Sequence, residues 1–188
     1  MKKGLLIVFS GPSGVGKGTI LKDLMKVEEL KLSYSVSMTT RKPREGEVEG
    51  VNYYYVSEER FKEAIANDEL LEYAQFVGNY YGTPKANVEM QRELGNNVVL
   101  EIEVVGAKQV LERNRDAISI FIVPPSIEEL ERRIRGRNTE TEEVIQLRVN
   151  KAKEELRESN MYQYVVCNDG VSRTIEILKD IILKEMRK

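Results

Sequence analysis

The stretch from Leu5 to Thr19, LLIVFSGPSGVGKGT, constrains this chain more than any other part of the sequence. Its apolar half predicts a β-strand, its glycines predict a tight loop, and the residues from Lys17 onward predict a helix. This order forms a phosphate cradle, because backbone N–H groups and the helix dipole face an anion and the lysine adds a charge. We therefore expect a nucleoside triphosphate here; an ordinary glycine-rich turn is the alternative. The residues of the predicted cradle are Gly11, Pro12, Ser13, Gly14, Val15, Gly16, Lys17, Gly18 and Thr19.

One position of the cradle departs from the usual pattern. A Ser or Thr that offers its hydroxyl to Mg²⁺ normally follows the lysine, but this chain has Gly18 there. The next residue, Thr19, carries a hydroxyl and is the candidate to take over that role. We expect Mg²⁺ to bind together with the triphosphate.

The composition excludes several other kinds of site. The chain has 188 residues, a length typical of one domain, and a formal net charge of −2, which does not favour nucleic acid as a partner. It has no histidine and one cysteine, Cys167, so Cys/His zinc sites, histidine-based triads and intrachain disulfides are excluded. The apolar run after Lys2 and Lys3 is too short for a secretory signal, and no segment is long enough to span a membrane. We expect a cytoplasmic protein.

Short apolar runs alternate with longer helical patterns, which predicts an α/β fold with a parallel sheet. The predicted strands are Leu5–Phe9, Val98–Ile102, Ile118–Val123 and Tyr164–Val166. The predicted helices are Lys17–Lys26, Ser57–Asn67, Pro84–Leu94, Val105–Arg113, Ser126–Arg135, Thr141–Ser159 and Ser172–Met186. Two helix starts carry capping signals. Ser126 and Glu129 have the spacing of a capping box, and Thr83 followed by Pro84 has the pattern of an N-cap and a first-turn proline.

Two polar stretches interrupt this alternation. Residues 34–56 lack helical periodicity and predict an irregular or antiparallel insert that forms a small lobe. Within it, Arg41 and Arg44 lie three residues apart and near Tyr53. Because Arg binds phosphate oxygens through two N–H groups at once, this cluster predicts a phosphomonoester site, with a basic surface loop as the alternative. The second stretch, residues 132–143, holds four arginines, and a solvated helix face is the simplest interpretation of them.

Five motifs together resemble the guanylate kinase family, one of the families of nucleoside-monophosphate kinases. They are GPSGVGKGT, SVSMTTRKPREGEVEGVNYYYVS, EYAQFVGNYYGTP, VLEIEVVGA and IFIVPPSIEELERRIRGRNTETEE, and they cover most of the chain in the family's order. The resemblance implies a P-loop NTPase-type parallel sheet flanked by helices, with a small mixed α/β GMP-binding lobe and a helical lid. It implies one domain over residues 1–188, with the core in 1–32, 97–125 and 160–188, the lobe in 33–96 and the lid in 126–159.

The same resemblance implies what these segments bind. It implies an ATP-dependent kinase of purine nucleotide metabolism that converts GMP to GDP and releases ADP, with dGMP as a second acceptor and Mg²⁺ bound as Mg-ATP. The implied GMP-binding residues are Ser37, Arg41, Arg44, Glu47, Tyr53, Glu72, Tyr81, Thr83 and Glu103. The implied catalytic residues are Lys17, Arg133, Arg137 and Arg148. Asn168 is implied to contact the adenine of ATP, although Gly170 stands where family members often have an aspartate.

The chemistry of guanine agrees with these assignments. Guanine presents N1–H and the N2 amine as donors and O6 as an acceptor, so Glu72 can accept from both nitrogens while Ser37 or Thr83 donates to O6. Glu101 and Glu103 lie two residues apart at the end of a predicted strand and therefore share a face. The resemblance implies that Glu103 approaches the guanine amine, and that Glu101 helps to hold the hydration shell of Mg²⁺ or orients arginines.

Two other functions remain open from the sequence. A guanylate-kinase-like binding module would keep the fold as a peptide-docking surface without catalysis, but such a module needs neither Lys17 nor the lid arginines. A related P-loop kinase would act on another phosphate acceptor, such as AMP or a sugar phosphate; Glu72 beside the run from Tyr80 to Thr83 argues against it. A monomer and a homo-oligomer are both compatible with the sequence.

Overall fold

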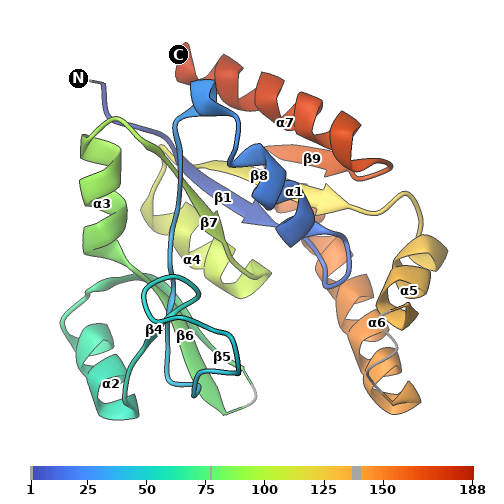
Figure 1. Cartoon of the computed structure of the whole chain (residues 1–188), viewed down its shortest axis with the longest axis horizontal. Coiled ribbons are helices and arrows are strands. Elements are labelled where there is room, and N and C mark those ends of the chain that lie inside the picture. Colours follow the sequence, from blue (N-terminus) through green and yellow to red (C-terminus); the bar gives the residue numbers. More distant parts are fainter. Residues whose placement is uncertain (1, 77, 137–140) are drawn as a thin grey trace.

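The computed structural model describes residues 2–76, 78–136 and 141–188, and its centre is a five-stranded sheet (Figure 1). The strands lie in the order β2-β7-β1-β8-β9, and all neighbouring pairs run parallel. Their bounds are Leu6–Ser10 for β1, Leu32–Tyr34 for β2, Asn97–Glu101 for β7, Ile118–Val123 for β8 and Tyr164–Cys167 for β9. The predicted parallel sheet is confirmed, and β2 is a strand that the sequence analysis missed.

The predicted helices are all present, with bounds that differ by a few residues. They are α1 (Lys17–Leu24), α2 (Glu58–Ala66), α3 (Lys85–Glu93), α4 (Val104–Arg113), α5 (Ile127–Arg135), α6 (Glu142–Arg157) and α7 (Val171–Met186), with short 3₁₀ helices at Glu28–Leu30 and Glu158–Met161. Ser126 caps α5 as predicted, because its hydroxyl accepts from the Glu129 backbone N–H at 3.1 Å. The predicted cap of α3 is wrong. Pro84 is the N-cap, and the Thr83 hydroxyl donates to Glu72 instead.

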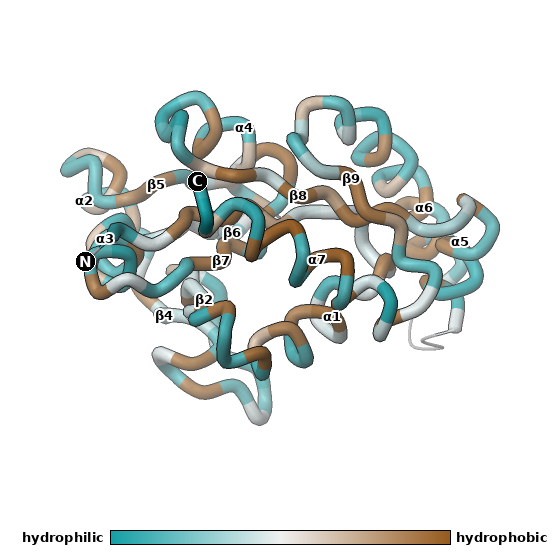
Figure 2. Tube along the Cα trace, turned by 90° about the horizontal axis from the view of Figure 1, so that it is seen from above, coloured by the Kyte–Doolittle hydropathy of each residue, from teal (hydrophilic) through white to brown (hydrophobic). Residues whose placement is uncertain are grey.

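Strand β1 lies in the middle of the sheet, and all five of its residues are buried. Leu6 and Val8 belong to one apolar cluster with residues of α3 and α4, whereas Ile7 and Phe9 belong to another with residues of α1 and α7. The alternation arises because successive side chains of a strand point to opposite faces of the sheet. Figure 2 shows α4 on one side of the strands, and α1 and α7 on the other. The main sheet is therefore covered by helices on both faces.

A second, mixed sheet forms a small lobe beside the main sheet. Its strands lie in the order β4-β3-β6-β5, and their bounds are Met38–Thr39 for β3, Tyr54–Tyr55 for β4, Leu70–Phe76 for β5 and Asn79–Pro84 for β6. β5 and β6 form an antiparallel pair, and β3 pairs antiparallel with β6 but parallel with β4. Phe61 and Ala64 of α2 pack with Met38 and Leu70 in a separate core. The insert at residues 34–56 is thus largely irregular, as predicted, but its two short strands β3 and β4 pair in parallel.

The second sheet lies on one side of the main sheet's carboxyl edge, and helices α5 and α6 lie on the other side (Figure 1). Leu130 and Ile134 of α5 share an apolar cluster with Ile145 and Val149 of α6. Ligands of open parallel sheets bind outside the carboxyl ends of the strands. In this chain that region lies between the second sheet and the helix pair α5 and α6. Within the described residues, no helix is long and apolar enough to cross a membrane.

Candidate active site

The cradle, residues 11–19, connects β1 to α1 at the centre of the main sheet. Two of its glycines are required by their surroundings. Gly14 has a φ of 84° and Gly16 a φ of 99°, a region of backbone conformation that favours glycine. A Cβ at Gly14 would lie 2.7 Å from Cγ1 of Ile134, and a Cβ at Gly16 would lie 2.9 Å from Nδ2 of Asn168. The cradle therefore packs closely against α5 and against the loop that follows β9.

Lys17 begins α1 and turns its amine back over the cradle. Its Nζ donates to the backbone carbonyls of Gly11 at 2.6 Å and Pro12 at 3.2 Å. Burial lowers the pKa of Lys17, while nearby carboxylates, of which Glu101 has the largest effect, act in the opposite direction. A phosphate that entered the cradle would offer this amine a stronger partner than the two carbonyls, because charge-assisted hydrogen bonds are stronger than neutral ones.

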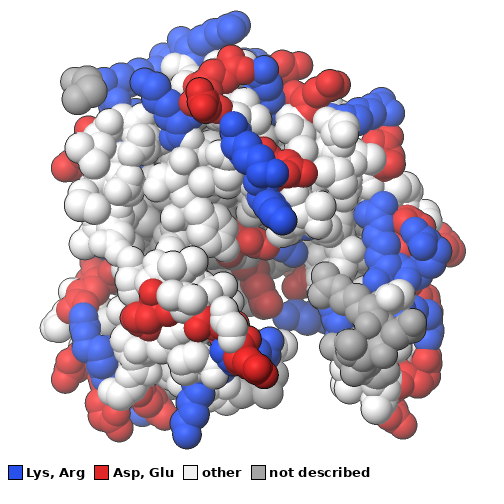
Figure 3. All heavy atoms as spheres, viewed as in Figure 1, with Lys and Arg blue, Asp and Glu red and all other residues white. Residues whose placement is uncertain are grey.

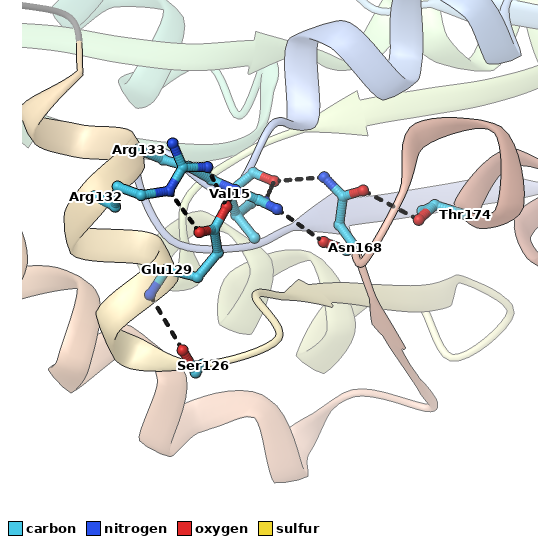
Figure 4. Close-up of polar contacts among 7 residues, drawn as sticks. All are labelled: Val15, Ser126, Glu129, Arg132, Arg133, Asn168 and Thr174. Carbon is cyan, nitrogen blue, oxygen red and sulfur yellow. Dashed lines mark hydrogen bonds and ion pairs between the residues drawn. The ribbon is translucent and has the colours of Figure 1, made fainter.

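Two arginines of helices α5 and α6 touch the cradle. Nη2 of Arg148 donates to Oγ of Ser13 at 2.8 Å. Nη1 of Arg133 donates to a backbone carbonyl of the cradle at 3.4 Å, and its Nε donates to the Glu129 carboxylate at 2.8 Å (Figure 4). The structure thus brings two of the three predicted catalytic arginines to the cradle. The third, Arg137, lies outside the described residues.

Asn168 follows β9 directly and is only 4% exposed. Its Nδ2 donates to the Val15 carbonyl at 2.8 Å, and its Oδ1 accepts from the Thr174 hydroxyl at 3.1 Å. Its backbone carbonyl accepts from Arg133 at 3.2 Å (Figure 4). The Asn168 side chain therefore braces the cradle from the side of β9 and α7. Its contact with the adenine of ATP stays a prediction.

A cavity of about 290 Å³, the acceptor cavity, lies where residues of the second sheet meet the carboxyl end of β7. The rings of Tyr53 and Tyr81 pack edge to face in its wall, with centroids 5.9 Å apart. Of the nine residues implied to bind GMP, the structure brings five together in this lining: Ser37, Tyr53, Glu72, Tyr81 and Glu103.

Glu72 is the most buried carboxylate of the acceptor cavity, with 5% of its surface exposed. The hydroxyl of Thr83, at the end of β6, donates to Oε1 of Glu72 at 2.5 Å. Burial raises the pKa of Glu72 to about 7, while the hydrogen bond from Thr83 acts in the opposite direction. Because a buried carboxylate has lost most of its hydration, it gains much from N–H donors that enter the cavity. Thr83 thus contacts Glu72 and is not among the residues that line the acceptor cavity.

Arg41 and Glu47, in the segment between β3 and β4, form a bidentate ion pair. Nη2 and Nη1 of Arg41 donate to the Glu47 carboxylate at 2.8 and 3.0 Å. Glu47 also accepts from the Arg44 backbone N–H and from the Tyr55 hydroxyl, both at 2.8 Å. The Arg41 guanidinium, followed by the Arg44 N–H, lowers the pKa of Glu47 to about 2. Arg41 also lies over the Tyr53 ring, 5.3 Å from its centroid, and so stays next to the acceptor cavity. The Arg44 side chain is exposed.

A second cavity, of about 310 Å³, lies between the cradle and the acceptor cavity and shares residues with both. Figure 3 shows the surface hollowed here, with acidic and basic side chains on its walls. From the cradle its lining includes Gly11, Ser13 and Lys17, and from the acceptor cavity Ser37, Tyr53, Glu101 and Glu103. The two predicted binding regions are therefore continuous.

The sequence analysis missed five residues of this second cavity: Tyr34, Asn52, Ile102, Lys151 and Glu155. The Tyr34 hydroxyl donates to Glu101 at 3.1 Å, Nζ of Lys151 donates to Glu103 at 3.0 Å, and Glu155 lies one turn after Lys151 on α6. Helical spacing could have found Lys151, because residues three apart on a helix are neighbours and Arg148 was already a candidate. Tyr34 carried no comparable signal.

Thr19 and Glu101 line a third hollow, of about 460 Å³, together with glycines and the lysine of the cradle. Hydroxyl and carboxylate oxygens are the ligands that Mg²⁺ accepts, directly or through water. The donor set here therefore fits a magnesium ion that arrives with a nucleotide.

Comparison with known proteins decides the family. A family model described as guanylate kinase matches residues 3–185. The chain belongs to the guanylate kinase family. It is 53% identical to the guanylate kinase of Bacillus anthracis over 184 residues, which are 98% of this chain and 90% of that protein. A crystal structure of guanylate kinase from Anaplasma phagocytophilum matches with a TM-score of 0.80 at 34% identity, covering 100% of this chain and 88% of that one.

Relatives of the guanylate kinase family differ in length from this chain. The guanylate kinase of Mycoplasma capricolum is 55% identical over 182 residues, which are 97% of this chain but only 61% of that protein. A shikimate kinase from Bacteroides thetaiotaomicron, 16% identical with a TM-score of 0.51 over 95% of this chain and 98% of that one, shares the fold alone. The resemblance seen in the sequence and the P-loop NTPase-type fold that it implied are confirmed.

Proposed function

We propose that this member of the guanylate kinase family transfers the γ-phosphoryl group of ATP to GMP and forms ADP and GDP. The observation that carries the proposal is the continuity of two sites, with Lys17 in the cradle at one end and the buried Glu72 at the other. A donor with its phosphates in the cradle and an acceptor with its base beside Glu72 bring their phosphates together between them. Such positioning supplies much of the rate in phosphoryl transfer.

Guanine would be recognised by carboxylates and hydroxyls of the acceptor cavity. Glu72 accepts from N1–H and the N2 amine, Glu103 approaches the same amine, and Ser37 donates to O6. Adenine presents the opposite pattern at these edges. A site built to pair such groups discriminates against a mismatched analogue by about 10⁴ to 10⁵, because its own buried polar groups would be left unpaired.

The phosphate of GMP would bind at the arginines and tyrosines beside the cavity. Arg41 stays over Tyr53 in its ion pair with Glu47, and we assign Glu47 the role of orienting this guanidinium toward the phosphate. Arg44 and Tyr81 complete the group that contacts the phosphate. Arg41 then needs little reorganisation when the acceptor arrives.

The transfer forms a bond from a GMP phosphate oxygen to the γ-phosphorus and breaks the bond from that phosphorus to the β–γ bridging oxygen. No general base is needed, because the attacking oxygen is already ionised. Mg²⁺, held near Thr19 and Glu101, would neutralise part of the triphosphate charge. The cationic side chains that we propose to offset the remaining charge are Lys17, Arg133, Arg137 and Arg148.

We also propose roles for the parts of the fold. The second sheet with α2, within residues 33–96, is the GMP-binding lobe, and α5 with α6, within residues 126–159, is the lid on a core formed by the rest of the chain. Closing of the lid over both nucleotides would exclude water, which would otherwise hydrolyse ATP. A cytoplasmic location fits these substrates.

A panel of acceptors tests the proposal. The protein is mixed with Mg²⁺ and ATP and offered GMP, dGMP, AMP, CMP or UMP, and the nucleotides formed are separated by chromatography. GDP and ADP should form in equal amounts from GMP, with AMP at least about 10⁴ times poorer. Glu72→Gln is the matched variant, because it keeps the size of the side chain and replaces one acceptor oxygen by a donor. Absence of GDP, or equal rates with GMP and AMP, would refute the proposal.

A further inference from the structure

Gly106 lies in the first turn of α4, where the backbone conformation does not require glycine. Its backbone is helical and buried, and it is not among the positive-φ glycines. Glycine inside a helix costs up to about 1 kcal/mol relative to alanine. The advantage of glycine here must therefore come from the space that it leaves.

That space is filled by the carboxylate of Glu72. A Cβ on Gly106 would lie 2.2 Å from Oε2 of Glu72, 2.9 Å from its Cδ and 3.3 Å from its Cγ, and these are its three nearest atoms. The other carboxylate oxygen accepts from the Thr83 hydroxyl. The carboxylate is thus held between β6 on one side and the bare backbone of α4 on the other.

The helix is not free to retreat from Glu72. Gln109, one turn after Gly106, forms two hydrogen bonds with the backbone of Tyr73, the residue next to Glu72 on β5. Its Nε2 donates to the Tyr73 carbonyl at 2.7 Å, and its Oε1 accepts from the Tyr73 N–H at 3.1 Å. These bonds fix α4 against β5. A methyl group at position 106 would therefore be accommodated by the flexible end of the Glu72 side chain.

We propose that Gly106 is a specificity-determining residue that positions Glu72 for guanine, an inference that rests on the function proposed above. An ordinary van der Waals contact begins at 3.4 Å, so Oε2 has to move by about 1.2 Å when residue 106 carries a methyl group. Losing a hydrogen bond to a charged group lowers affinity about 10- to 100-fold. The fold keeps its stability, because only a side-chain end moves and alanine favours the helix.

The test is Gly106→Ala, with Gly170→Ala as the matched control, because a Cβ at Gly170 meets no heavy atom within 4 Å. We expect the KM for GMP to rise about 10- to 100-fold in Gly106→Ala, with the KM for ATP and the Tm close to those of the unaltered chain. The KM for inosine monophosphate, which lacks the 2-amino group, should rise less than the KM for GMP. The preference for GMP over inosine monophosphate should therefore become smaller. Gly170→Ala should retain the GMP preference of the unaltered chain.

A double-mutant cycle keeps the inference falsifiable if Gly106→Ala folds poorly. Glu72→Asp removes one methylene and withdraws the carboxylate from α4. Adding Gly106→Ala to Glu72→Asp should then change neither the Tm nor the KM for GMP further, because contacting residues act non-additively. Additive effects in the cycle would overturn the inference, and so would an unchanged GMP to inosine monophosphate ratio in a folded Gly106→Ala. Failure of the proposed function is distinct, because the unaltered chain itself would then form no GDP.

Discussion

Protonation of Glu72 should control the affinity for GMP near neutral pH. Burial raises the pKa of this carboxyl to about 7 in the empty protein. Guanine requires the ionised form, because a protonated carboxyl turns an O–H toward the N–H groups that it should accept from. Between pH 8 and pH 6 the ionised fraction falls from about 0.9 to about 0.1. The Kd for GMP should therefore rise about tenfold over this interval.

Binding should also release protons. The N–H donors of guanine stabilise the charged carboxylate and lower its pKa, so titration calorimetry near pH 6.5 in buffers of different ionisation enthalpy should detect proton release. The affinity for GMP rises with pH, whereas the free energy of unfolding of the empty protein falls. Because the folded state binds more protons than the unfolded state between the ordinary carboxyl pKa and about 7, stability falls as pH rises through that window, by roughly 3 kcal/mol at most.

The control is Glu72→Gln. The phosphate of GMP titrates with a pKa of about 6 and makes its own contribution to the pH dependence of binding. Binding to Glu72→Gln keeps this contribution but lacks that of the carboxyl. The difference between the two binding profiles therefore isolates Glu72. If the unaltered chain and Glu72→Gln showed the same dependence of the GMP Kd on pH between 6 and 8, the reasoning would be wrong.

Three further predictions follow from the contacts of the cradle. Lys17→Ala should lower kcat by about 10³-fold or more with little change in Tm, measured as ADP release in a coupled assay; near-normal turnover would contradict its role. Arg148→Ala should lower kcat by about 10³ to 10⁵, by analogy with an arginine finger, and a change confined to KM would argue for binding alone. Asn168→Ala removes the 2.8 Å hydrogen bond to the Val15 carbonyl and leaves only the longer one from Arg133, so it should lower the free energy of unfolding by about 1 kcal/mol while raising the KM for ATP. Denaturant unfolding and ATP titration measure these two effects, and an unchanged stability would count against the brace.

The main sheet and its helices could be predicted because their signals are local. β1 and β8 are short, predominantly apolar runs, β8 with four β-branched residues of six, and α5 carries its Ser126 cap in the sequence. The strands of the second sheet could not be predicted from such local signals. β3 and β4 have two residues each, too few to show any period, and their pairing depends on residues far along the chain. β5 alternates poorly, because its first three residues are all buried.

The candidate site also combines residues that the sequence identified with contacts that only the tertiary fold determines. Residue types and spacing identified the cradle, and the family resemblance supplied Glu72, Ser37 and Tyr53, which the structure brings into one cavity. The partners of these residues could not be predicted. Thr83 has the sequence pattern of a helix cap, yet its hydroxyl binds a carboxylate eleven residues away, on a neighbouring strand. Which of two local roles a side chain takes depends on what the tertiary fold places beside it.

The cations of the site share one property that explains how it can exist without ligands. Lys17 binds cradle carbonyls, Arg41 binds Glu47, Arg133 binds Glu129 and Lys151 binds Glu103. Buried charges without partners cost several kcal/mol, so these contacts stabilise the empty site chiefly at the more buried cations, Lys17 and Arg41, and little at the half-exposed pair of Lys151 with Glu103. A ligand then enters by exchanging or joining existing partners rather than by meeting bare charges. Phosphate is suited to this exchange, because it offers more negative charge and more acceptor oxygens than the carbonyls and carboxylates already present.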